Sequence, residues 1–314
     1  MENADMKYPQ ATFIIVSYNQ EKYIAEAIDG AFAQDYPNLE IIISDDCSRD
    51  KTWDIIQEKA NQYKGSHKVI INRNEPNLGP REHFNKVLYD LSHGDIIVLA
   101  GGDDISRKDR VSKCVDVMLA HPSISSLSCM SQTIHEDGIP FEPTPWNTMS
   151  TNHLSIYTLW DYVYTNMIVF SGDSRVLRRN VIDSFPPLKY SYAEDVYLFI
   201  RSFYVGDVAL IHEPLVKYRQ HDSSIMGKTR LRKKVSKEEY KQFEQTSAKQ
   251  IRVDLQYAID HNYIETPYVD IVSSKIEDII SWLRPQQKTF PHRVIRKIKK
   301  HVSRWCNKLD EKLP

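Results

Sequence analysis

The sequence predicts an α/β protein: a mostly parallel, Rossmann-like sheet flanked by helices, with a helical extension at the C-terminal end. Short apolar runs rich in β-branched residues recur along the first 100 residues, and helical patterns separate them. Strands that alternate with helices of this length form parallel sheets, because a crossover helix returns the chain to the start of the next strand. Turn-forming polar residues follow each apolar run.

Four units of strand and helix fill residues 11 to 121. Each strand is short and apolar throughout, which is typical of a strand buried on both faces. Each helix is predicted from apolar positions that recur every three or four residues. In order, the elements are strand 11–16, a helix from about 21 to 35, strand 39–44, helix 52–63, strand 69–71, helix 80–91, strand 95–99 and a helix from about 108 to 121.

The later elements are predicted from fewer signals. The residues S-R-K-D at 106–109 fit a capping box for the fourth helix. Strand 124–134 follows, and then a segment at 137–152 that is rich in Pro, Gly, Ser, Thr and Asn and is expected at the surface. An amphipathic helix is expected from Glu194, with its apolar residues on one side.

The composition shifts past Met226, which divides the chain into a catalytic domain at 1–226 and a helical region at 227–314. Within the second region, residues 288–304 contain seven Lys or Arg and no acid, while apolar residues and Trp305 recur every three or four positions. This basic amphipathic pattern over 288–305 is typical of a helix on an anionic membrane surface. The alternative is a helix packed on the domain with a solvated basic face.

Composition excludes several classes of protein. With 314 residues, 41% hydrophobic and 26% charged residues and a net charge of -1, the chain is expected to fold and not to bind nucleic acid. The four cysteines have no zinc-site spacing. Neither a signal peptide nor a run of 18 apolar residues occurs, so we expect a cytoplasmic protein whose membrane contact is peripheral, on the inner face of the cytoplasmic membrane.

The common nucleotide and hydrolase motifs (GxGxxG, GxxxxGK[ST], GxSxG and HExxH) are absent. What remains is a set of acids and one aromatic residue at successive strand and helix ends: Tyr18, Asp45, Asp46, Asp103, Asp104, Glu194 and Asp195. Ligands bind at the carboxyl ends of parallel strands, where adjacent carboxylates can hold a divalent cation. Two structural alternatives remain, because Gly-Asp-Asp is good turn chemistry and acids favour a first helical turn.

Segment 13–52 resembles the opening of the family 2 glycosyltransferases. It has an apolar strand followed by Y-N, a Q-x-Y-P turn, and a second strand that ends in D-D-x-S-x-D-x-T. The later motifs N-L-G at 77–79, G-G-D-D at 101–104, E-D at 194–195 and Y-R-Q-H-D-S-S at 218–224 come in that family's order, so the resemblance covers about residues 10 to 225.

The resemblance implies a GT-A fold, a nucleotide-diphosphate-sugar donor such as a UDP-sugar, a Mn²⁺ or Mg²⁺ ion, and inversion at the anomeric carbon. Ser17, Tyr18 and Asn19 would contact the nucleotide-sugar, with Tyr18 beside the nucleobase. Asp46 would accept a hydrogen bond from the base, and Asp45 would hold the loop or contact the nucleoside.

For the metal and the chemistry, the resemblance implies that Asp104 ligates the cation and that Asp103 contacts the ribose or assists the metal. Asp195 would be the general base, and Glu194 would position the acceptor or the donor sugar. A metal neutralises the charge that develops on the phosphate oxygens, and one base without an enzyme nucleophile means a single displacement.

Three departures from the family pattern bear on these roles. His83-Phe84-Asn85 stands where the family often has A-R-N, so Arg81 is either a diphosphate or base contact or a surface arginine. Gly101 replaces the first acid of the metal motif. Arg219 and His221 match a loop that closes over the diphosphate, although a loop histidine can instead bond the backbone.

The sequence therefore predicts an inverting, metal-dependent enzyme that transfers a sugar to a hydroxyl of a glycan or lipid-linked acceptor. The expected process is bacterial surface polysaccharide, O-antigen or lipopolysaccharide assembly. The alternative is a non-catalytic nucleotide-sugar-binding regulatory or scaffold protein, against which the two intact acid pairs argue. A sugar nucleotidylyltransferase is excluded, since no G-x-G-T-R loop follows the first strand.

Overall fold

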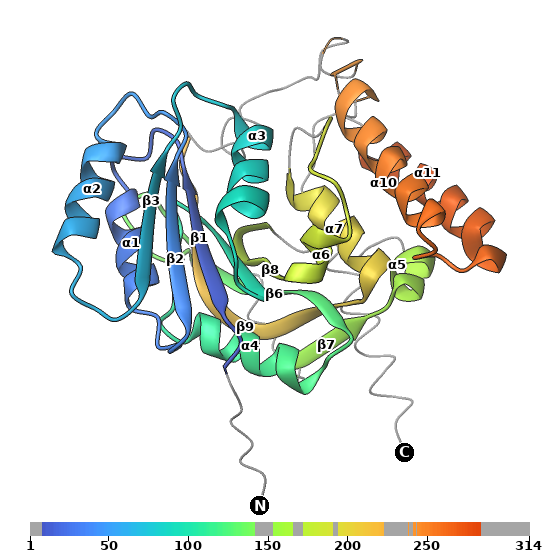
Figure 1. Cartoon of the computed structure of the whole chain (residues 1–314), viewed down its shortest axis with the longest axis horizontal. Helices are drawn as coiled ribbons and strands as arrows, with labels where there is room; N and C mark the ends of the chain where they lie inside the picture. The colour runs from blue at the N-terminus through green and yellow to red at the C-terminus, as the bar shows by residue number, and fades with distance from the viewer. Residues whose placement is uncertain are drawn as a thin grey trace, which may run out of the picture.

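The computed structural model describes residues 8–141, 153–165, 172–190, 194–222, 238, 241–242 and 244–283. Within these ranges the chain forms one mixed sheet of nine strands with helices on both faces (Figure 1). The strand order is β3-β2-β1-β4-β8-β6-β9-β5, and β7 pairs with β9. The predicted fold class is confirmed in its main feature, a parallel sheet built from the first hundred residues.

The N-terminal half contains the four predicted strands in parallel. Register places Ser17, Asp45 and Arg73 side by side at the ends of β1, β2 and β3, and Val16 beside Gly101 at the end of β4. All four carboxyl ends therefore lie along one edge of the sheet. The elements are β1 (Ala11–Ser17), α1 (Ile24–Phe32), β2 (Leu39–Asp45), α2 (Thr52–Gln62), β3 (Lys68–Arg73), α3 (Pro80–Asn85), the π-helical turn η1 (Lys86–Leu91) and β4 (Ile96–Gly101).

Alternation along the strands supplies a core on each face of the sheet. Phe13 and Ile15 of β1 pack with α1, α2 and α4, whereas Ile14 between them packs with η1, α6 and α7. Successive side chains of a strand point to opposite faces, so a strand covered on both faces is apolar at every position. This is why the strands appear in the sequence as continuous apolar runs.

The C-terminal half of the sheet is mixed. Strand β6 coincides with the predicted strand 124–134, and it runs parallel to β9, while β8 joins β4 and β6 antiparallel. The two apolar stretches near 208 and 215 form one strand, β9, whose register shifts beside Pro214. The elements are β5 (Ile105–Ser106), α4 (Arg110–Ala120), β6 (Ile124–Ile134), β7 (Leu154–Tyr157), α5 (Leu159–Thr165), η2 (Gly172–Ser174), β8 (Val176–Arg178), α6 (Arg179–Asp183), α7 (Glu194–Val205) and β9 (Asp207–Arg219).

The capping-box interpretation of residues 106–109 is wrong. Helix α4 begins at Arg110 after Asp109, and the Asp109 side chain makes no capping hydrogen bond; the amide of Val111 in the first turn donates to Gln34 Oε1 at 3.0 Å. The Asp109 carboxylate instead accepts hydrogen bonds from the Arg107 guanidinium, one of them 2.9 Å long. A charged donor two residues away binds the carboxylate more strongly than the helix amides do.

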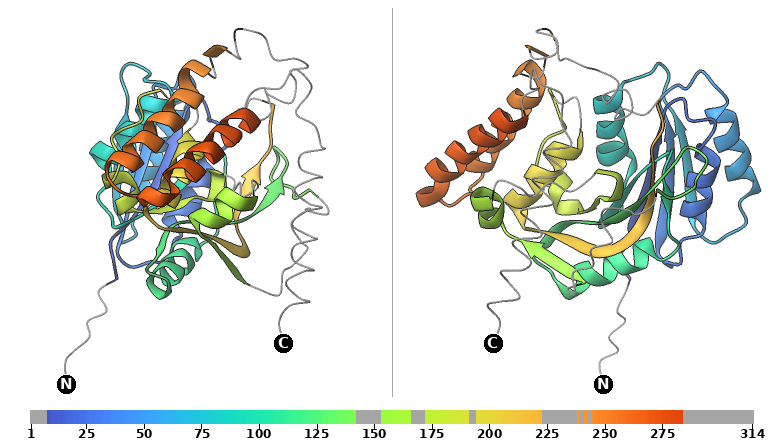
Figure 2. Two further views of the ribbon diagram at one scale, coloured as in Figure 1. Left: turned by 90° about the vertical axis from the view of Figure 1, so that its right-hand side faces the viewer. Right: turned by 180° about the vertical axis from the view of Figure 1, so that it is seen from behind.

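The last described helices pack against α5 and α7. They are η3 (Glu244–Ala248), α10 (Lys249–Asp260), η4 (Thr266–Tyr268) and α11 (Val269–Leu283). Their apolar faces form one buried cluster with α5 and α7, and they lie beyond α7, at the far end of the molecule from α1 and α2 (Figure 2). The domain boundary at 226 stays a prediction, and the basic segment 288–305 lies outside the described residues. No helix in the described ranges is long and apolar enough to cross a bilayer.

Candidate active site

The loops after β1 and β2 are joined by hydrogen bonds at the carboxyl edge of the sheet. The amide of Asn19, which has a φ of 54°, donates to Ser48 Oγ at 2.8 Å, and Asn19 Oδ1 accepts from the amide of Arg49 at 2.9 Å. The Ser17 hydroxyl donates to the carbonyl of Ser44 at 3.1 Å. Tyr18 between them is 45% exposed, so its ring lies open at this edge.

Asp45 holds the loop after β2. Its side chain is fully buried, and it accepts hydrogen bonds from the amide of Ser48 at 2.9 Å and from the Ser48 hydroxyl. Arg73 Nε at the end of β3 lies 3.7 Å from Asp45 Oδ2. Of the two roles expected for Asp45, these contacts favour holding the loop.

Asp46 organises the loop that precedes α3. Its Oδ1 accepts from the amide of Leu78 and from Asn74 Nδ2, both at 2.9 Å, and its Oδ2 accepts from the amide of Gly79 at 2.8 Å. The side-chain Nδ2 of Asn77 donates back to the Asp46 backbone carbonyl at 2.5 Å. The carboxylate is 3% exposed, so it shapes this loop, and its contact with a nucleobase stays a prediction.

Arg81 lies on the first turn of α3. It does not turn toward the loop at 17–20: Nη1 donates to the carbonyl of Lys189 at 2.9 Å, and Nη2 donates to Glu82 at 2.6 Å. Lys189 belongs to the segment that leads into α7. The role of Arg81 as a diphosphate contact therefore stays a prediction.

Asp103, Asp104 and the end of β9 meet beyond the last residue of β4. Asp104 Oδ1 accepts from the amide of Arg219 at 2.9 Å, and His221 Nε2 lies 3.0 Å from Asp103 Oδ2. A Cβ added at Gly101 would lie 2.7 Å from Asp103 Oδ1. A side chain at position 101 would therefore require the Asp103 carboxylate to move.

The carboxylate of Asp104 is destabilised by its surroundings. Burial raises its pKa well above the usual range, and the nearby carboxylates of Asp103 and Asp173 raise it further. A cation bound here would offset this unfavourable clustering of carboxylates and favour the ionised form of Asp104. The electrostatics of this edge thus match the predicted role of the Asp pair.

Asp173, in η2, is a site residue that the sequence analysis missed. Ser131 donates a hydrogen bond to its Oδ2, while its Oδ1 is buried and has no hydrogen-bond partner in the structure. The residue stands beside β4, because the amide of Leu99 donates to the carbonyl of Arg175. The only sequence feature at this position is the tripeptide G-D-S just before a strand, and this pattern is typical of an ordinary turn.

Arg219 is buried and is bound inside the protein. Its Nε donates to the Asp103 carbonyl at 3.0 Å, and its other nitrogens donate to the carbonyl of Glu136 at 2.7 Å and to Glu26 at 3.0 Å. Tyr23 packs beneath both the guanidinium and the ring of His221. Arg219 therefore fixes the end of β9 over the Asp pair, and its contact with a diphosphate stays a prediction.

The predicted base lies at the start of α7. Glu194 is the first residue of the helix and Asp195 lies in its first turn; their side chains are outside the described part of the structure. The chain enters this helix from Lys189, which contacts Arg81 beside the carboxyl edge. The backbone thus brings the Glu-Asp pair to the same side of the molecule as the strand ends.

The donor set fits a hard divalent cation. Carboxylate and imidazole ligands suit Mn²⁺ and carboxylates suit Mg²⁺, and Asp103, Asp104 and His221 present those groups. Across the residues that the structure describes, no three or more His, Cys, Asp or Glu side chains are close enough to form a preassembled cation site. A cation would have to separate the His221 and Asp103 side chains, which now contact each other.

A mixed sheet with acid pairs at its carboxyl edge, and with a third acid pair at the start of a helix, is the arrangement expected of a glycosyltransferase with a GT-A fold. The sequence model of "Glycosyl transferase family 2" matches residues 12–185. The chain belongs to this family.

Several known proteins are similar to this chain. An uncharacterized protein of Mycobacterium tuberculosis is 32% identical over 222 residues, which cover 68% of this chain and 60% of the relative. The fold is shared with TarS of Staphylococcus aureus, a poly(ribitol-phosphate) β-N-acetylglucosaminyltransferase solved with UDP-GlcNAc, at a TM-score of 0.61 and 20% identity over 87% of this chain and 73% of that one. It is also shared with the mannosyltransferase PcManGT of Pyrobaculum calidifontis, solved with GDP-Man and Mn²⁺, at a TM-score of 0.55 and 16% identity over 88% of this chain and 72% of that one.

Proposed function

We propose that this protein transfers a sugar from a nucleotide-diphosphate-sugar, such as a UDP-sugar, to a hydroxyl of a glycan or lipid-linked acceptor, with inversion. The observation that carries the proposal is the meeting of Asp103, Asp104 and His221 at the end of β4, on the edge that also presents Tyr18. The nucleotide-sugars bound to TarS and PcManGT support the donor class. The name of TarS as a poly(ribitol-phosphate) β-N-acetylglucosaminyltransferase supports a role in surface polysaccharide assembly.

Three groups of this chain would hold the metal: Asp104, Asp103 and His221. A bound Mn²⁺ or Mg²⁺ neutralises the negative charge that develops on the leaving diphosphate. The buried carboxylate of Asp104, held by the Arg219 amide, gives a fixed oxygen to this site. Asp173 supplies a further buried oxygen that can accept a hydrogen bond from a donor hydroxyl.

Asp195 would take the proton of the acceptor hydroxyl as that oxygen attacks the anomeric carbon. The leaving diphosphate, which gains negative charge, would lie at the Asp pair, and the base would approach from the first turn of α7. Because one base serves the incoming hydroxyl and no enzyme nucleophile takes part, a single displacement inverts the anomeric carbon. Glu194 would position the acceptor or the donor sugar.

The proposed function is tested by incubating the full chain with a panel of nucleotide-sugars, Mn²⁺ and glycan or lipid-linked acceptors. NMR of the product reports the anomeric configuration. Transfer with an inverted anomer is expected. Tight donor binding without hydrolysis or transfer for every acceptor would instead favour a nucleotide-sugar-binding regulatory or scaffold protein.

Tyr18 gives a direct test of the nucleobase position. We expect Tyr18→Ala to weaken donor binding by about 10-fold, since stacking of a base on an aromatic ring is worth about 1–3 kcal/mol. The exposed ring makes little packing, so the melting temperature should stay within about 1 °C. Tyr18→Phe keeps the ring and should keep the affinity; equal affinity of Tyr18→Ala and wild type would place the base elsewhere. Isothermal titration with the nucleoside diphosphate measures both variants.

We propose separately that the basic segment 288–305 contacts an anionic membrane peripherally. This contact would bring a lipid-linked acceptor to the enzyme. Seven basic residues beside an anionic bilayer contribute about 1 kcal/mol each near the surface. Deletion of 288–314 should therefore lower co-sedimentation with vesicles rich in phosphatidylglycerol at low salt by at least about 10-fold. Neutral phosphatidylcholine vesicles are the control. Unchanged binding to anionic vesicles would leave the segment as a packing element.

A further inference from the structure

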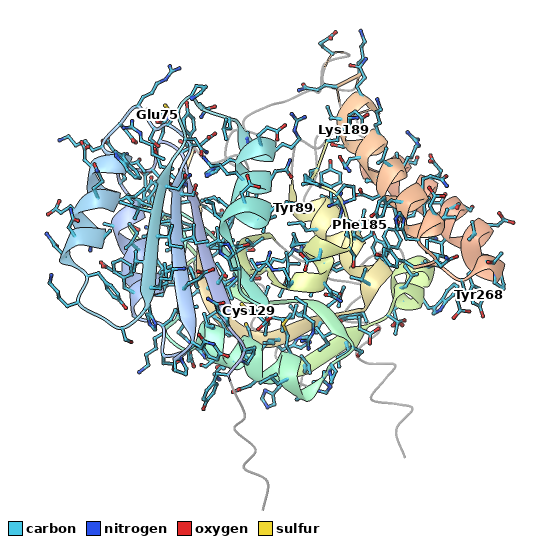
Figure 3. The ribbon with its side chains drawn as sticks, viewed as in Figure 1. Glu75, Tyr89, Cys129, Phe185, Lys189 and Tyr268 are labelled. Atoms are coloured by element: carbon cyan, nitrogen blue, oxygen red, sulfur yellow. The ribbon has the colours of Figure 1, made fainter. Side chains whose placement is uncertain are left out.

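The segment at 188–190, which leads into α7, has no helix or strand of its own and is held by side chains from two helices. From α3, Asn85 Nδ2 donates to the Leu188 carbonyl at 2.8 Å, and Asn85 Oδ1 accepts from the Leu188 amide at 2.9 Å. From α10, Gln250 Oε1 accepts from the amides of Lys189 and Tyr190, both at 2.8 Å. Figure 3 shows Lys189 beside α10, at the end nearest α3.

Gln250 is itself fixed by a buried network that returns to α7. It is 1% exposed, and its Nε2 donates to Asp254 Oδ1 at 2.9 Å. Asp254 accepts two hydrogen bonds from Arg201, at 2.9 and 2.8 Å, and Arg201 is a fully buried residue of α7. Arg201 also donates to the hydroxyl of Tyr89 at 3.1 Å. The middle of α7 is thus tied through α10 to the segment that precedes the first turn of α7.

The network has few ways to relax. Two backbone amides share the single oxygen of Gln250, and the amide group of that side chain is oriented by Asp254. Both hydrogen bonds are partly buried, so removing this oxygen leaves two backbone amides without their protein acceptor, and we expect the segment to shift toward water. Any such movement is passed within four residues to Glu194.

We propose that Gln250, in the C-terminal helical region, is a positioning residue for glycosyl transfer: by holding the amides of Lys189 and Tyr190, it sets the place of the first turn of α7. The inference rests on the proposed function of Asp195. It makes α10 part of the catalytic apparatus, although the family model ends at residue 185.

Gln250→Met removes the oxygen at nearly constant volume, and Gln250→Glu restores it. The matched control is Gln256→Met, an exposed glutamine of the same helix whose side chain donates a hydrogen bond to Asp260 at 2.8 Å. We expect Gln250→Met to lower kcat by about 10- to 100-fold with the donor KM within about twofold, since a shift of about 1 Å at a catalytic group has effects of this size. Gln250→Glu keeps the oxygen but replaces the Nε2 donor to the buried Asp254 carboxylate, so it should recover part of kcat only toward low pH, where the new carboxyl group is protonated. Gln256→Met should match wild type.

Hydrogen–deuterium exchange gives a second readout that needs no activity. The peptide covering 185–190 should exchange at least about tenfold faster in Gln250→Met than in wild type, while peptides of β1 and β2 stay unchanged. Faster exchange together with lower kcat supports the inference. Unchanged exchange, unchanged kcat, or a loss confined to the donor KM overturns it.

Two further results separate this inference from the proposed function. If the wild type transfers sugar and Asp195→Asn does not, the function stands whatever Gln250→Met does. If the wild type does not transfer, the proposed function fails, and the inference fails with it because no catalytic turn is being positioned. If Gln250→Met does not fold, Asn85→Asp is measured in its place. This variant keeps the oxygen that accepts from the Leu188 amide but removes the Nδ2 donor to the Leu188 carbonyl, and it must lower kcat.

Discussion

Asp195→Asn is expected to lower kcat by about 100- to 10,000-fold while the affinity for the donor nucleotide stays within about twofold. Asparagine has nearly the same shape as aspartate but cannot take the proton of an incoming hydroxyl, and general base catalysis contributes about this factor. The donor is expected at the Asp pair after β4, so its binding does not need the base. Single-turnover transfer and donor titration measure the two quantities separately.

The matched control is Asp116→Asn, the same chemical change at an exposed position of α4. It should leave kcat unchanged. Near-wild-type transfer by Asp195→Asn would rule out this residue as the base. A parallel loss of donor affinity would place its carboxylate on the donor instead of the acceptor.

Asp104→Asn is expected to have two opposite effects. It should lower metal-dependent transfer by at least about 100-fold, because several kcal/mol of charge stabilisation depend on the metal. It should also raise the melting temperature of the metal-free protein. Burial and two neighbouring carboxylates raise the pKa of Asp104, so its ionised form opposes folding at neutral pH, and asparagine removes that charge while keeping an acceptor for the Arg219 amide.

The pH dependence of this stability change follows from the difference in the Asp104 pKa between the folded and unfolded states. A carboxyl group whose pKa is raised by folding favours the folded state at low pH, and this contribution is lost as pH rises through the folded-state pKa. The stability advantage of Asp104→Asn should therefore be small near pH 4 and grow toward pH 8, at about 2 to 4 °C for each kcal/mol. Added Mn²⁺ should stabilise the wild type at pH 8 and not the variant. These comparisons are made by calorimetry in chelated and Mn²⁺-containing buffer.

Asp109→Asn is a control for which the change in melting temperature is expected in the opposite direction. Hydrogen bonds from Arg107 lower the pKa of this carboxyl group, so its ionised form favours folding. Asp109→Asn should slightly lower the melting temperature above pH 5 and leave transfer unchanged. A lower melting temperature for metal-free Asp104→Asn would contradict the electrostatic account of the Asp pair.

The N-terminal half of the fold was predictable because local pattern and tertiary environment agree there. Strands buried on both faces must be apolar at every position, and β2 lies within one residue of its predicted bounds. In α7 the local sequence pattern and the tertiary environment disagree. Its apolar residues were expected on one side, yet Arg201 and Ser202 are also fully buried, because α10 and β6 cover the remaining faces. Such burial depends on partners far along the chain.

The same distinction applies to the candidate site. Asp103 and Asp104 could be singled out from their position after an apolar strand, and the structure brings His221 to them. The side chain of Arg81, by contrast, is bound to Lys189, a residue 108 positions away that no local pattern connects with it. Gln250 carries no motif at all, and only the tertiary contacts reveal it.

The position of β9 has a consequence for the order in which the protein is assembled. This strand lies inside the sheet, between β6 and β5, and it carries Arg219, whose amide binds a carboxylate 115 residues earlier. Contacts of such sequence separation form late in folding. During synthesis, residues 8–141 can emerge from the ribosome with the four paired parallel strands β1 to β4, but without the residue that holds Asp104. If the Asp pair and His221 hold the metal as proposed, a nascent chain cannot complete that site until residue 221 has emerged, and turnover would depend on completion of the fold.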